Sequence, residues 1–133
     1  MHRGLRIAAL LLAVDSSAVA FAEGLPQDLH GNWVPSRESC SSSLGIRVSS
    51  QAMQFHNGER QRSFEIDTCF SCEGGARYSG IVVWATPTNS EGQSFTAYFN
   101  AGERKGVTIV EIPSFELQSQ FPLHNVKLKH CGP

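Results

Sequence analysis

Apolar and polar residues alternate with a period of two along much of the chain, which is the pattern of strands with one buried face. Phe64, Ile66 and Phe70 fall on one face of such a segment, whereas Glu65 and Asp67 fall on the other. Similar short runs, alternating, β-branched or apolar on both faces, are separated by turn residues about every 8–12 positions. They cover residues 31–34, 46–48, 52–56, 81–84, 95–99, 107–112, 115–117 and 126–130.

This succession predicts an all-β fold, a small antiparallel β-barrel or sandwich of seven to nine strands with no helix. Asn57-Gly58 separates two of the runs and predicts a hairpin turn, because both residue types tolerate positive φ. A barrel has the advantage that closure leaves no exposed sheet edge. The pattern of apolar positions does not decide between barrel and sandwich.

The first 22 residues have a different pattern, that of an export signal. Arg3 and Arg6 frame the start of an unbroken apolar run, 7–14, and Ala20 and Ala22 have the small-x-small spacing of a signal-peptidase site. A bilayer span needs roughly 20 apolar residues, so we expect a cleaved signal and no membrane span. The remaining residues, 23–133, have the length of a single domain. Export predicts a periplasmic or secreted protein.

Four cysteines follow the signal: Cys40, Cys69, Cys72 and Cys131. An even number of cysteines in a small exported domain predicts disulfides, here two, and four cysteines allow three pairings. Residues three apart on a strand point to opposite faces, so Cys69 and Cys72 are expected to have separate partners. A redox C-x-x-C centre would need a thiolate at a helix N-terminus. A zinc site would need a second pair of ligands. Neither signal is present, so we expect structural bridges and no metal.

Charge and motifs argue against catalysis and nucleic-acid binding. The net charge is −1 and no basic stripe is present, so no nucleic-acid partner is expected. No Gly-x-Ser-x-Gly elbow or phosphate-binding loop occurs, which predicts neither enzymatic activity nor a cofactor. Glu65 and Asp67 share a strand face as an acid/base pair would, but such a face is more simply a solvated outer surface.

Two short motifs resemble known families. Gly31-Asn32-Trp33 resembles the Gly-x-Trp opening strand of the lipocalin and avidin group of small barrels. That resemblance implies a tight entry at the glycine and a tryptophan that plugs one barrel end, often against a basic side chain. The simpler interpretation is that Trp33 is an ordinary core residue.

The segment 74–80, Gly-Gly-Ala-Arg-Tyr-Ser-Gly, resembles the Ser-Gly-x-x-Tyr loop of the periplasmic inhibitors of c-type lysozyme. Those are small disulfide-containing barrels whose loop enters the lysozyme cleft. Gly75 matches the motif glycine and Tyr78 its tyrosine, whereas Gly74 stands where that family has serine. Tyr and Arg are also enriched in binding hot spots. The resemblance therefore implies a partner-binding loop containing Gly74, Gly75, Arg77, Tyr78 and Ser79; the alternative is a plain β-turn.

The sequence thus predicts an exported binding protein with a protein partner. The most specific version of this prediction is an inhibitor or immunity protein that acts on a cell-wall hydrolase such as lysozyme. One alternative is a lipocalin-like carrier of a small apolar ligand, which would need Trp84, Phe95 and Phe99 around an open cavity. An inhibitor would instead have these aromatics packed. Another alternative is a structural component of the envelope.

Overall fold

The alternation of buried and exposed residues produces eight strands. The computed structural model describes residues 24–73, 80–89 and 91–133, so the expected signal at 1–22 lies outside the described residues. The strands are β1 (Gly31–Pro35), β2 (Leu44–Val48), β3 (Ala52–Asn57), β4 (Arg60–Cys69), β5 (Val83–Pro87), β6 (Thr96–Phe99), β7 (Val107–Glu111) and β8 (Lys127–His130).

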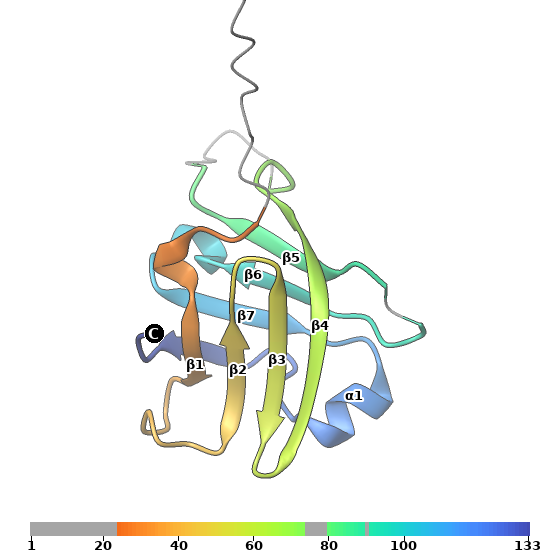
Figure 1. Cartoon of the computed structure of the whole chain (residues 1–133). Coiled ribbons are helices and arrows are strands. Elements are labelled where there is room, and N and C mark those ends of the chain that lie inside the picture. Colours follow the sequence, from red (N-terminus) through yellow and green to blue (C-terminus); the bar gives the residue numbers. More distant parts are fainter. Residues whose placement is uncertain (1–23, 74–79, 90) are drawn as a thin grey trace, which may run out of the picture.

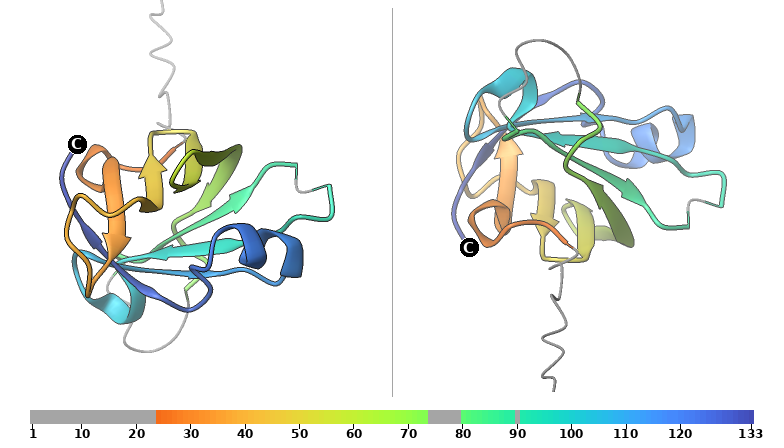
Figure 2. Two further views of the ribbon diagram at one scale, coloured as in Figure 1. Left: turned by 90° about the horizontal axis from the view of Figure 1, so that it is seen from below. Right: turned by 90° about the horizontal axis from the view of Figure 1, so that it is seen from above.

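Each strand pairs antiparallel with the next one along the chain, and β8 pairs with β1 to close the barrel. Figure 1 shows this succession of strands, and in Figure 2 β1–β4 form one wall and β5–β7 the opposite one. The predicted all-β fold of seven to nine strands is therefore confirmed. Closure selects the barrel over the sandwich, because each strand then has a hydrogen-bonding partner on both sides.

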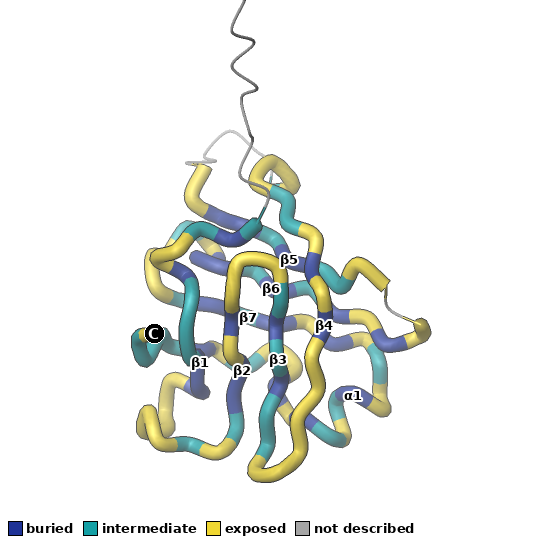
Figure 3. The backbone as a smooth tube through the Cα atoms, in the orientation of Figure 1, coloured by how far each residue is buried: buried dark blue, intermediate teal, exposed yellow. Residues whose placement is uncertain are grey.

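The core lies inside the barrel and is built from inward-facing apolar side chains. Burial alternates along β3 and β4 in Figure 3, as the period of two predicts. Phe55 is the centre of an aromatic cluster, with ring centroids 5.8 Å from Phe64, 5.0 Å from Phe95 and 5.6 Å from Phe121. The predicted Asn57-Gly58 hairpin joins β3 and β4, and Gly58 has a φ of 64°.

The expectation of no helix, with a strand at 115–117, is wrong. Helix α1 (Phe115–Gln120) lies between β7 and β8. Ser114 caps it by accepting a hydrogen bond from the backbone N–H of Leu117 (3.2 Å), and Leu117 is buried. One buried residue in a single turn and a half cannot produce a helical period, so residues 115–117 look like alternation. The Asn57 side chain donates to the carbonyl of Gln120, which joins α1 to the β3–β4 turn (3.0 Å).

Two short 3-10 helices, η1 (Gln27–Leu29) and η2 (Ala101–Glu103), lie toward the other end of the barrel. The apolar run at 81–84 is only partly a strand, because β5 begins at Val83 and residues 81–82 belong to the connection from β4. Among the described residues, the helices are too short and too polar to span a membrane.

Candidate functional site

The connection between β4 and β5 contains the segment that the loop resemblance identifies. The predicted partner-binding residues of this segment lie outside the described residues: Gly74, Gly75, Arg77, Tyr78 and Ser79. The described residues on either side, 69–73 and 80–82, are at the end of the barrel that also carries η1 and η2 (Figure 1).

A disulfide holds the start of this connection. Cys69 pairs with Cys72, and Cys40 pairs with Cys131. The two predicted bridges are confirmed, but the expectation that Cys69 and Cys72 have separate partners is wrong. The strand rule fails there because β4 ends at Cys69 and the chain bends before Cys72, which brings the two Cα atoms to 5.6 Å.

Two side-chain hydrogen bonds fix the connection further. The Trp84 indole N–H donates to the Glu73 carboxylate (2.9 Å), and Trp84 is the direct β-ladder partner of Cys69. On the exit side, the Asn100 side-chain amide donates to the carbonyl of Ile81 (2.9 Å). Both flanks of the segment 74–79 are therefore held to the barrel, which reduces the conformational entropy that a binding surface there would lose.

Exposed hydrophobic side chains lie on both flanks. Phe70 is 43% exposed and Ile81 is 37% exposed, and both side chains lie at the same hollow, so they form a small apolar patch. They border a hollow of about 400 Å³ that is also lined by Leu29 and Val83, with Asp28 and Lys105 contributing charged groups. The hollow and its apolar rim can receive an apolar side chain of a partner.

The barrel interior is packed with aromatic rings. Phe95 and Phe99 are 1% and 0% exposed, and Phe95 contacts Phe64 with ring centroids 5.1 Å apart. Trp84 is on the outer face of β5, where its ring contacts Tyr98 edge-on at 5.0 Å. The three aromatics that a carrier would need around one cavity are therefore divided between the core and the outer surface.

Two residues of the Gly31-Asn32-Trp33 motif have clear physical roles. Trp33 is fully buried, and its indole N–H donates to the carbonyl of Leu29 in η1 (3.0 Å). Its ring stacks on the imidazole of His130, the residue opposite it on β8, at 4.6 Å. A Cβ at Gly31 would lie 2.1 Å from the carbonyl oxygen of Gly132, so this position requires glycine.

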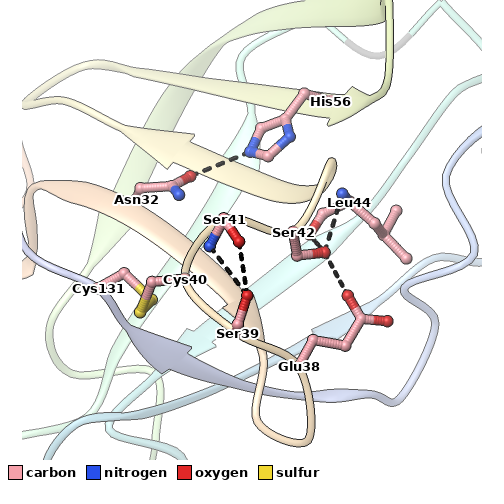
Figure 4. The surroundings of a disulfide bond; sticks show 9 residues. All are labelled: Asn32, Glu38, Ser39, Cys40, Ser41, Ser42, Leu44, His56 and Cys131. Carbon is pink, nitrogen blue, oxygen red and sulfur yellow. Dashed lines mark hydrogen bonds between the residues drawn. A yellow bond between two sulfur atoms is a disulfide. The ribbon is translucent and has the colours of Figure 1, made fainter.

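A second, polar hollow of about 420 Å³ lies beside the Cys40–Cys131 bridge. Figure 4 shows His56 reaching across to Asn32, with 3.0 Å between Nε2 and Oδ1. The imidazole crosses β2 at Gly45, where any Cβ would lie 3.1 Å from the ring. The sequence offered one signal for this contact, a glycine inside a strand, which often marks close approach of another group.

The residues that could have suggested catalysis or metal binding are dispersed. Glu65 and Asp67 are exposed on the outer face of β4, where they line a polar surface groove with Ser49 and Thr88. Within the described ranges, His, Cys, Asp and Glu side chains form no group of three that could hold a metal ion. Glu65 and Asp67 thus occupy the solvated outer surface that their alternation predicts.

The sequence and the structure were compared with known proteins. No family model, curated protein or solved structure matches this chain.

Proposed function

We propose that the protein is an exported binding protein that recognises a protein partner through the end of the barrel around the β4–β5 connection. The observation that carries the proposal is the pair of exposed side chains, Phe70 and Ile81, on a connection held by a disulfide and two hydrogen bonds. Large apolar groups presented on an anchored backbone bind at low entropic cost. The packing of Phe95 and Phe99 in the core favours this function over that of an apolar-ligand carrier.

The sharpest form of the proposal is inhibition of a cell-wall hydrolase such as lysozyme, with a periplasmic or secreted site of action. It is supported by the resemblance of residues 74–80 and by the two disulfides, which form and persist in oxidising compartments. Binding by the loop, with Phe70 and Ile81 against the rim of the cleft, would block substrate without any chemistry by the inhibitor.

A lysis assay tests this form directly. The purified, oxidised protein is added to c-, g- and i-type lysozymes acting on cell-wall suspensions, beside the variants Tyr78→Ala and Phe70→Ser. Phe115→Ser is the matched control, because Phe115 is 85% exposed but lies on α1, toward the other end of the barrel. We expect inhibition by the wild type and the control, and its loss in the two site variants.

No inhibition at large molar excess would exclude the lysozyme form. The general proposal would then be tested by capture from envelope extracts with immobilised wild type, Phe70→Ser and Phe115→Ser. It requires a partner retained by the wild type and the control and lost by Phe70→Ser. Equal retention by all three proteins would refute it.

A further inference from the structure

The outer face of β5–β8 carries a row of side chains that does not fit a water-facing barrel wall. Direct neighbours on these four successive strands are Trp84, Tyr98, Ile109 and Lys127. We call these four residues the outer row. The first three are half-buried and Lys127 is exposed, so a continuous strip of two aromatic rings and an aliphatic side chain is accessible from outside.

The opposite wall shows what a solvated outer face looks like in this protein. Most of its outward positions on β2–β4 are polar or charged, with Arg47, Gln54, Ser63, Glu65 and Asp67 among them. Outward positions that meet only water are expected to be polar, and runs of apolar groups there usually serve an interface. The outer row is therefore a candidate contact surface, whereas the wall formed by β2–β4 is not.

The rings of the outer row are held in place before any partner arrives. The Tyr98 hydroxyl donates to the Glu111 carboxylate (2.9 Å), and the Trp84 indole N–H donates to Glu73 (2.9 Å). The two rings also contact each other edge-on. A preorganised aromatic pair loses little side-chain entropy on association.

The charges at the two ends of the outer row indicate that its partner is a second copy of the same protein. Glu73 lies at the β5 end of the row, and Lys127 lies at the β8 end with no ion-pair partner among the residues that the structure describes. A row that is negative at one end and positive at the other is complementary to itself when rotated by 180°. A two-fold axis between Tyr98 and Ile109 would set Lys127 of one copy against Glu73 and Trp84 of the other, twice in each pair.

We infer that the outer row forms a symmetric homodimer interface, in which each Lys127 ammonium binds the Glu73 carboxylate and the Trp84 ring of the second copy. Tyr98 of each copy then packs on Ile109 of the other. The interface shares the Trp84–Glu73 contact with the anchored β4–β5 connection. It is tested by the mass of the protein in solution and not by binding of another protein, so its failure and the failure of the proposed function are distinguishable. A single row covers less than the roughly 800 Å² per partner of a stable complex, so we expect a weak dimer that forms only at high protein concentration.

Sedimentation velocity over a concentration series tests the inference. We expect the mass to rise from one protomer to two with concentration, and less so at high salt because the contacts are charged. Glu73→Lys and Lys127→Glu should each weaken the dimer about tenfold or more. The double variant carrying both changes should restore it in part, because it recovers the ion pair but not the contact of an ammonium with the Trp84 ring. An equimolar mixture of the two single variants should restore it in part for the same reason.

Arg47→Glu and Glu65→Lys make equal charge changes on the opposite wall and serve as controls, with circular dichroism to verify folding. They should leave the dimer unchanged. A protein that stays monomeric at millimolar concentration would overturn the inference. So would a dimer that is insensitive to Lys127→Glu, or one that the double variant fails to restore.

Discussion

The two disulfides should differ strongly in what they contribute to stability. Cys40–Cys131 closes a loop of 91 residues and joins the middle of the β1–β2 connection to the end of β8, whereas Cys69–Cys72 spans only 3 residues. In the chain-entropy model a bridge stabilises by restricting the unfolded chain, and the effect grows with the logarithm of loop length. The model gives about 4.5 kcal/mol for the long loop and about 1.5 kcal/mol for the short one.

The comparison uses Cys40→Ala/Cys131→Ala and Cys69→Ala/Cys72→Ala. Each bridge has one exposed and one half-buried cysteine, so the two double variants lose similar packing and differ mainly in loop length. For a domain of this size about 4 °C of melting temperature corresponds to 1 kcal/mol. We expect the melting temperature to fall by roughly 18 °C without Cys40–Cys131 and by roughly 6 °C without Cys69–Cys72.

The assay is urea unfolding followed by tryptophan fluorescence and far-ultraviolet circular dichroism, with thermal melts in parallel. Coincident transitions in both signals would support two-state unfolding and allow the free energies to be compared. Equal losses in the two variants would refute the reasoning, because loop length would then not govern the contribution. A larger loss of unfolding free energy without Cys69–Cys72 would show that the short bridge stabilises parts of the barrel beyond the bend that it closes.

Three further results are expected. Gly45→Ala should lower the free energy of unfolding by about 1–3 kcal/mol in urea titration, because a Cβ there would lie 2.3 Å from the carbonyl oxygen of Trp33. Thr108→Val should raise it by about 1 kcal/mol in the same assay, because the buried Thr108 hydroxyl has no hydrogen-bond partner among the described residues; a loss of stability would contradict this. Burial, followed by the hydrogen bond and charge of Glu111, raises the pKa of Tyr98 above 10.0. The stability that Tyr98 contributes is therefore complete below pH 10 and is lost as the pH rises through its pKa in the folded state. Absorbance titration of the Tyr78→Phe variant, in which Tyr98 is the one remaining tyrosine, should show ionisation above pH 10. Adding Glu111→Gln should lower the pH at which Tyr98 ionises.

Several features of this protein follow from local sequence. The alternation of Phe64 and Ile66 with Glu65 and Asp67 is sufficient to orient β4, because a strand exposes successive side chains to opposite faces. Asn57-Gly58 defines its hairpin for an equally local reason. The all-β class and a range of seven to nine strands could therefore be predicted before any contact was known, and the even number of cysteines predicted two disulfides.

The tertiary structure decided what depends on residues distant in sequence. Whether β8 returns to β1 depends on pairings such as Trp33 with His130, which no local pattern encodes. The Cys69–Cys72 bridge exists because the strand ends at Cys69, and strand ends depend on the neighbours available for pairing. The exposed flanks of the β4–β5 connection and the outer row also depend on contacts between residues that are distant in sequence. Period-two alternation tells which residues lie on the same face, and only the closed barrel determines which faces meet water and which side chains become neighbours across strands.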